Sequence, residues 1–196
     1  MIDLVKLRCT VAKFESVWFP LPIEDNPKFW FQARNAKFRH LITDLCSECL
    51  NVVEELQSSN VSPVDLVNQL RSAGWSNKDL VVLAILLDQM PRNALAINFG
   101  RYADAERTNV GAVIDDSYAL EFASHIKTHF FHSNWVDMRI VCFYSLIFRH
   151  SNRFDEAREV LLSLQSSDEP GSDVQLPPLA QKFWSETQKR QDALGT

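Results

Sequence analysis

Helix start signals recur along this chain, and they restrict its fold more than any other feature of the sequence. Each start combines a capping side chain with a proline at the first helical position or with an acidic residue three positions later, which satisfies free N–H groups of a first helical turn. Gly74 marks a helix stop, because glycine readily adopts the left-handed conformation that closes a helix. The starts are Asn26-Pro27, Ser62-Pro63 with Asp65, Ser76 with Asp79, Asn134 with Asp137, and Asn152 with Asp155.

Apolar residues recur at intervals of three and four between these starts, as on one face of an amphipathic helix. The longest such stripe is Phe38, Leu41, Leu45, Cys49, Val52 and Leu56. Two solid apolar runs, Leu80–Leu87 and Ile140–Phe148, have no polar side. Their length alone does not exclude strands, but the preceding helix caps favour central helices that are surrounded by other helices. Both runs are too short to cross a bilayer.

These patterns predict an all-α fold of about eight helices, arranged as a TPR-like antiparallel stack of helical hairpins. The segment Arg153–Leu164 has the character of one helix of a TPR hairpin, although no repeat with a period of about 34 residues is present. The chain of 196 residues is long enough for one domain, 1–196, with a real core. We expect a solvated loop at 165–175 and a C-terminal helix at 177–194.

Charge and composition exclude several classes of partner. The net charge is −5 with Lys and Arg dispersed along the chain, so no basic block is present to bind nucleic acid. The N-terminus has no charged region followed by a long apolar one, as a secretory signal would. We therefore expect no nucleic acid, no membrane and an intracellular, most simply cytoplasmic, location, with an organelle left open.

The cysteine pattern also argues against metal binding and redox activity. Cys46 and Cys49 form a C-x-x-C pair, but a structural zinc site needs four ligands and no second pair exists. The pair lies within a helical pattern instead of the strand–turn context of a redox motif. We interpret both as buried residues of a helix face, and we expect no metal and no cofactor.

The hexamer Asp88-Gln-Met-Pro-Arg-Asn93 is the most distinctive stretch of the sequence, because it follows directly on a buried apolar run. A residue before proline is disfavoured from the helical conformation, so we expect a sharp break at Pro91. The polar residues Asp88, Gln89, Arg92 and Asn93 would then lie at a joint between two core helices. They either satisfy the free backbone groups of those helix ends, which we favour, or form a pocket for an anionic or amide-bearing ligand anchored by Arg92.

This hexamer, after Ala-Ile-Leu-Leu, resembles the D-Q-F-P-R-N signature of the domain of unknown function 924 family. Further segments resemble that family in the same order, over roughly residues 15–165. They are Val17-Trp18-Phe19, Phe29-Trp30-Phe31 with Phe38, Asp116-Ser-Tyr-Ala-Leu120, and the stretch from Arg139 to His150-Ser151. The resemblance implies an α-helical, TPR-like fold and brings no established reaction or cofactor.

Several residues depart from the family pattern. Ala96 and Ile97 stand where relatives have Arg-Gly, Asn152 stands where they have Glu, and Arg39 where they have Asp. The polar family positions that remain are Asp88, Arg92, Asn93, Arg139 and His150, and we add Gln89 and Asp116 to the candidate pocket.

Histidines provide the last candidate site. His150 could act as a general base, or it could be a cation that caps the end of its helix. The cap is favoured, because Asn152 leaves no adjacent acid to orient the imidazole. His125, His129 and His132 could share a helix face, but no carboxylate at matching spacing completes a metal site, and solvated or packing roles are favoured.

The sequence therefore predicts a helical protein-interaction or scaffold domain that binds another polypeptide, as a subunit of a larger assembly or a homo-oligomer, and without catalysis that depends on His150. The alternative is a small-molecule-binding protein or enzyme with a pocket around Asp88, Arg92, Arg139 and His150. A deep polar pocket at these four residues would favour the alternative, and a large exposed aromatic patch would favour the scaffold.

Overall fold

The chain is all-α in the computed structural model, which describes residues 2–19, 36–99, 116–130, 137–164 and 176–195. These ranges hold eight helices and no strand, which confirms the predicted fold class. The TPR-like arrangement stays a prediction. The helices are α1 (Leu4–Trp18), α3 (Ala36–Ser58), α4 (Pro63–Ser72), α5 (Asn77–Phe99), α6 (Ser117–Phe130), α7 (Met138–His150), α8 (Phe154–Leu162) and α9 (Pro178–Leu194).

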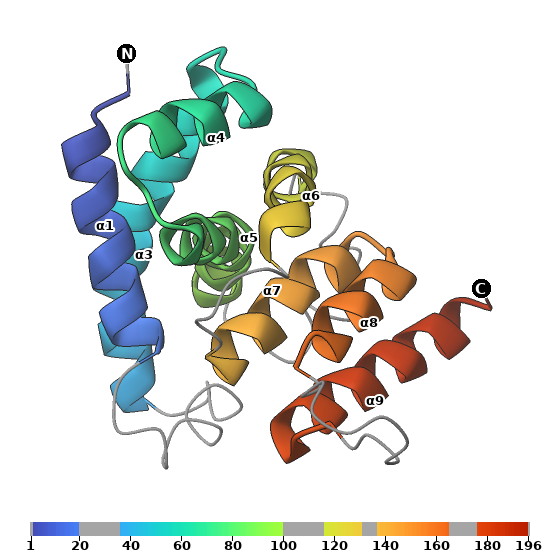
Figure 1. Ribbon diagram of the computed structural model, residues 1–196. Coiled ribbons are helices and arrows are strands. Elements are labelled where there is room, and N and C mark those ends of the chain that lie inside the picture. Colours follow the sequence, from blue (N-terminus) through green and yellow to red (C-terminus); the bar gives the residue numbers. More distant parts are fainter. Residues whose placement is uncertain (1, 20–35, 100–115, 131–136, 165–175, 196) are drawn as a thin grey trace.

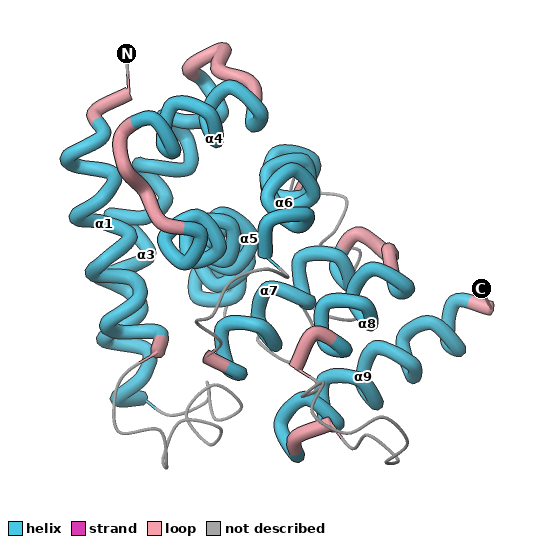
Figure 2. Tube along the Cα trace, viewed as in Figure 1, coloured by secondary structure: helices cyan, strands magenta, loops and turns pink. Residues whose placement is uncertain are grey.

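Helix α5 lies at the centre of the molecule. It is seen nearly end-on in Figure 1, with α1 and α3 running side by side on one side of it and α6 and α7 on the other. It contacts α1, α3, α6 and α7, while α8 and α9 pack onto the far side of α7. Figure 2 shows that short loops join α4 to α5 and α7 to α8. Residues on α5 are therefore placed where the two halves of the helical assembly meet.

Two of the predicted helix starts are confirmed in atomic detail. The Ser62 hydroxyl accepts a hydrogen bond from the N–H of Asp65 at 3.1 Å and donates to the Asp65 carboxylate. Ser76 and Asp79 form a reciprocal capping box, in which each side chain accepts from the other residue's N–H. Gly74 closes α4 with a φ of 76°, as expected. The start at Asn26-Pro27 lies outside the described residues.

One helix start was missed and two were placed wrongly. Asp3 caps α1 by accepting from the N–H groups of Val5 and Lys6 at 3.0 Å. Helix α7 is capped by Asp137, which was expected only as the acidic partner of Asn134, a residue outside the described ranges. Asn152 does not cap α8, which has no side-chain cap bond.

Asn152 instead closes α7 from the left-handed region, with a φ of 59°. Its N–H donates to the carbonyl of Arg149, and the N–H of Arg153 donates to the carbonyl of Phe148 at 2.8 Å. This is a Schellman motif, and asparagine tolerates its left-handed position better than other residues with a β-carbon.

Replacing Asn152 therefore has opposite effects that depend on the new side chain. We expect Asn152→Gly to leave stability unchanged or raise it slightly, and Asn152→Glu to lower the free energy of unfolding by about 1 kcal/mol, because the left-handed conformation strains it. Chemical denaturation of both variants measures this. Equal stability of the two variants would contradict the left-handed assignment.

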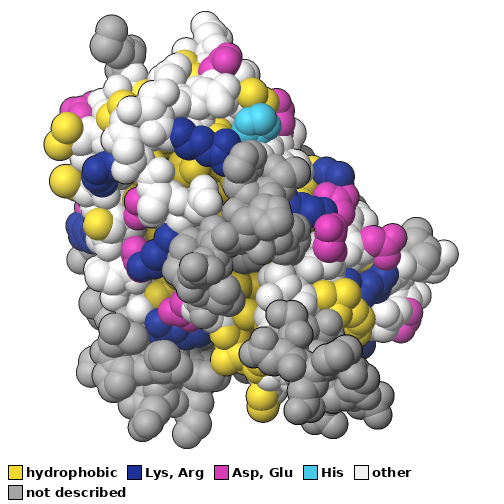
Figure 3. Space-filling model, viewed as in Figure 1, with side chains coloured by type: hydrophobic (Ala, Val, Ile, Leu, Met, Phe, Trp, Pro, Cys, Tyr) yellow, Lys and Arg dark blue, Asp and Glu magenta, His cyan; other side chains and the backbone are white. Residues whose placement is uncertain are grey.

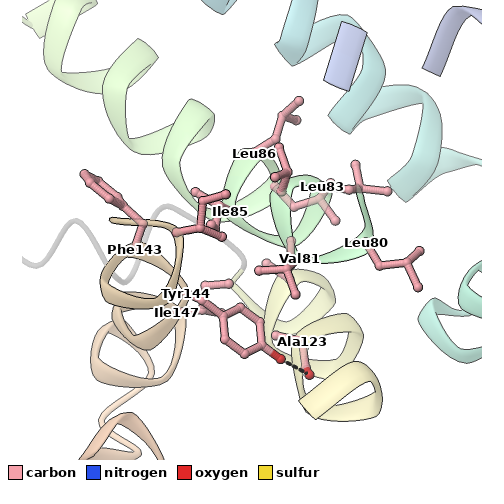
Figure 4. Packing of buried hydrophobic residues seen from close by; sticks show 14 of the residues in the cluster. Leu80, Val81, Leu83, Ile85, Leu86, Ala123, Phe143, Tyr144 and Ile147 are labelled. Carbon is pink, nitrogen blue, oxygen red and sulfur yellow. Dashed lines mark hydrogen bonds between the residues drawn. The ribbon is translucent and has the colours of Figure 1, made fainter. Parts of the chain in front are cut away.

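The core is built around α5 and α7. Every residue of Leu80–Leu87 and of Ile140–Phe148 is buried, which confirms that both runs are surrounded helices. Figure 4 shows Val81 and Ile85 on the side of α5 that faces α7, and Leu83 and Leu86 on another side of the same helix. The hydroxyl of Tyr144 on α7 donates to the carbonyl of Ala123 on α6 at 2.7 Å (Figure 4). This bond ties α6 to α7 within the core.

The cysteine pair belongs to this core. Cys46 and Cys49 are buried on α3, and the Cys46 sulfur lies 3.8 Å from that of Met90 on α5. Burial raises the pKa of each thiol to about 12, so both remain protonated and serve as packing groups at neutral pH. Over the same described ranges, none of the helices combines the length and the apolar character that crossing a membrane requires.

Candidate functional site

Helix α5 continues through Pro91, and the predicted break at that residue is wrong. Proline removes one helical N–H and disfavours the helical conformation of Met90, but Met90 is fully buried and held by the core. The ion pair between Asp88 and Arg92 also spans Pro91, and the i, i+4 spacing brings these side chains together only in a continuous helix. The polar residues therefore share one helix instead of lying at a joint between two.

Asp88 is the centre of the site. Its side chain is 0% exposed, and it bonds three side chains from two helices. Nδ1 of His150, at the end of α7, lies 2.9 Å from Asp88 Oδ2. The Gln89 amide donates to the same oxygen at 2.6 Å, and Nε of Arg92 donates to Oδ1 at 3.1 Å. A buried carboxylate is tolerated only with such compensation.

Arg92 extends the site towards α6. Its Nη2 group pairs with Oδ2 of Asp116, which immediately precedes α6. The guanidinium thus bridges two carboxylates, which leaves it engaged and does not suit the anion-anchoring role of the pocket alternative. Exposure of the side chains increases from 0% at Asp88 to 11% at His150, 16% at Asp116 and 19% at Arg92. The cluster therefore has a buried floor and a rim that reaches the surface.

The protonation state of the Asp88–His150 pair follows from its surroundings. Burial by itself raises the pKa of Asp88, but His150 and Arg92 outweigh this effect and hold that pKa well below its ordinary value. Burial lowers the pKa of His150, and its interaction with Asp88 only partly opposes this shift. Asp88 is therefore ionised and His150 neutral at neutral pH.

The ionised state of Asp88 determines the tautomer of His150. An ionised carboxylate only accepts hydrogen bonds, so Nδ1 of His150 must donate to Asp88. In a neutral imidazole the other nitrogen, Nε2, then carries a lone pair. A buried carboxylate that fixes a histidine in this way is the arrangement by which proteins orient a general base.

His150 thus corrects two expectations. An acid does orient its imidazole, but that acid is Asp88 on another helix, 62 residues away, instead of a neighbour at position 152. The imidazole lies in the last turn of α7, as a cap would, yet burial disfavours the cationic form that a cap would use. Of the three histidines considered as a possible metal site, His125 is half-buried on α6, and the side chains of His129 and His132 lie outside the described residues.

The remaining predicted site residues divide into two groups. Gln89 and Asn93 belong to the cluster, since Gln89 bonds Asp88 and the Asn93 amide donates to the Gln89 carbonyl at 2.7 Å. Arg139 does not belong to it. Its guanidinium pairs with Asp137 at the start of α7. Eleven residues of helix place it about 16 Å from His150 along the axis.

The stability of the fold should depend on pH through His150. Because burial lowers the pKa of His150 in the folded state, its contribution is fully present above its ordinary pKa of 6.5 and is lost as the pH falls towards the folded value. Asp88 has a lowered pKa and loses its contribution only below its ordinary value of 3.8, and Asp116, whose pKa burial raises, acts with the opposite sign in that acidic range. Between pH 7 and pH 5, His150 is therefore the titrating group of the cluster.

We expect the free energy of unfolding to fall over this interval with a slope below about 1.4 kcal/mol per pH unit, the limit for one proton. The slope should be smaller in His150→Gln than in the matched control His125→Gln, which removes a half-buried histidine outside the cluster. Urea denaturation at several pH values measures it. An identical slope in His150→Gln and in the wild type would contradict the buried neutral histidine.

Comparison of the chain with protein families, curated proteins and solved structures finds no match. The resemblance to the domain of unknown function 924 family therefore stays a prediction. The geometry adds one observation, because Asp88 and His150, which come from two separate segments of the resemblance, contact each other.

Proposed function

We propose that the protein binds a small polar molecule at the cluster of Asp88, Arg92, Asp116 and His150, and that Nε2 of His150 accepts a hydrogen bond or a proton from it. The observation that carries the proposal is the 2.9 Å contact between Nδ1 of His150 and the fully buried Asp88. Asp88 acts as the positioning residue, and His150 is the group that meets the ligand.

Burial of the charges also supports a binding role. A buried charged cluster costs desolvation free energy, and hydrophobic residues of similar volume often replace such a cluster without loss of stability. Strongly shifted pKa values in a partly open cluster are frequent at functional sites. The neutral imidazole is poised to accept a proton, so the same geometry supports general-base catalysis once a substrate is bound.

A thermal-shift screen with a panel of metabolites tests this function on the wild type, His150→Gln and the matched control His125→Gln. We expect at least one compound to raise the melting temperature of the wild type and of His125→Gln but not that of His150→Gln. A compound present at 100 times its dissociation constant stabilises by about 2.7 kcal/mol. A hit that stabilises all three proteins equally would place the binding site elsewhere and contradict the proposal.

The scaffold function, with a protein partner or a homo-oligomer and a cytoplasmic location, stays a prediction. An exposed aromatic patch would favour it, but the large exposed apolar side chains of the described residues are Val5, Leu162 and Leu194, which are aliphatic and lie on three helices. On the face shown in Figure 3, positive and negative side chains are mixed among smaller hydrophobic areas. The exposed side chains of the described residues therefore do not form the aromatic patch that would favour the scaffold.

A further inference from the structure

Besides Nε2 of His150, the cluster holds a second hydrogen-bond acceptor that has no donor. Oδ1 of Asp116 is buried and has no hydrogen-bond partner within the described ranges, although Oδ2 of the same carboxylate pairs with Arg92. A buried carboxylate oxygen without a donor costs free energy, which a ligand that brings a donor would recover. Nε2 of His150 is also an acceptor in the tautomer derived above. The cluster thus contains two hydrogen-bond acceptors without a donor, and Oδ1 of Asp116 is the buried one of the two.

The charges of the cluster favour the same kind of ligand. Asp88 and Asp116 are two carboxylates that share one guanidinium, that of Arg92, and the imidazole of His150 is neutral. These four side chains together therefore carry a net charge of −1. Arg149 lies next to His150, but its charge also interacts with Glu186. An anion would meet the unpaired oxygen of Asp116 and find Arg92 already engaged.

We propose that the ligand is a small organic cation of the primary-amine class, held between Nε2 of His150 and Oδ1 of Asp116. This inference rests on the proposed function and specifies its ligand. An ammonium group has three N–H donors and no acceptor, which matches two acceptors and an excess negative charge. A metal ion fits less well, since His150 Nδ1 and both Asp88 oxygens are engaged and the described residues hold no group of three or more ligating side chains placed for a metal.

An NMR titration at low salt tests the charge of the ligand, with the ring nitrogens of His150 as the probe. The compounds are ethanolamine as the cation, inorganic phosphate as the anion, and ethylene glycol as a neutral molecule of similar size. We expect ethanolamine alone to produce a saturable shift of the His150 signals. Asp116→Asn should weaken its binding about tenfold or more, which corresponds to about 1.4 kcal/mol.

Two further variants keep this test decisive. Asp116→Glu retains the charge and should retain more of the affinity than Asp116→Asn, which separates the charge from a general loss of structure. Asp192→Asn removes an exposed carboxylate on α9 and should bind ethanolamine as the wild type does.

Saturable binding of phosphate, equal binding of ethylene glycol, or no shift with any of the three compounds would overturn the cation inference. If phosphate binds and His150→Gln abolishes that binding, the cation inference is overturned and the proposed function is retained. A hit of the metabolite screen that ignores His150 would instead remove the proposed function, so the two failures are distinguishable.

Discussion

Replacing Arg92 by alanine lowers the free energy of unfolding by about 3–5 kcal/mol, the loss that follows when one partner of a buried ion pair is removed. Arg92 pairs with both Asp88 and Asp116, so the change leaves two carboxylates without their shared cation. Asp88 is 0% exposed and has no access to water in compensation. Chemical denaturation monitored by circular dichroism measures the loss.

The matched control is Arg153→Ala, whose ion pair with Glu156 lies at the surface with the arginine side chain 44% exposed. Exposed pairs contribute about 0–1 kcal/mol, so the control should lose no more than that. An Arg92→Ala protein as stable as Arg153→Ala would contradict the buried cluster.

Phe122→Ala should lower the free energy of unfolding by a similar amount, about 3–5 kcal/mol, because it leaves a cavity in the core. Phe122 is 0% exposed on α6, and this helix packs against α4, α5 and α7. The neighbouring residue Glu121 is exposed on the same helix, and Glu121→Ala should change stability by about 0.5 kcal/mol or less. Thermal and urea unfolding of both variants provide the comparison, and a Phe122→Ala loss below about 1 kcal/mol would show that α6 is not packed as described.

The parts of the fold that the sequence predicted correctly depend on contacts within a few residues. The caps at Ser62 and Ser76 bond residues three positions away, so their spacing alone reveals them. The same spacing was misleading at Asn152, because asparagine is suited both to an N-cap and to the left-handed end of a helix. Only the preceding helix α7, which closes on Asn152, distinguishes the two roles.

Pro91 was misjudged because its local bias was considered without tertiary context. The sequence shows a proline that disfavours a helical Met90. It does not show that Met90 is buried in the core or that the Asp88–Arg92 pair holds the helix together across the proline. The burial of Met90 and the ion pair outweigh the conformational bias that proline imposes on the one residue before it.

The candidate site was predicted in composition but not in arrangement. Asp88, Gln89, Arg92 and Asn93 fall within six consecutive residues of one helix, so their grouping is local. The contact of Asp88 with His150 joins two helices, and no spacing in the sequence indicates it. Arg139 was included because it shares the resemblance with His150, yet it lies at the other end of α7.

The protonation state of His150 tests the account most directly, since both proposals require an acceptor at Nε2. Two-bond ¹H–¹⁵N NMR spectra of the imidazole distinguish the two neutral tautomers and the cation. At pH 7 we predict a neutral ring with the proton on Nδ1, and loss of that fixed tautomer in Asp88→Asn. A doubly protonated ring at pH 7, or a proton on Nε2 in the wild type, would contradict the account.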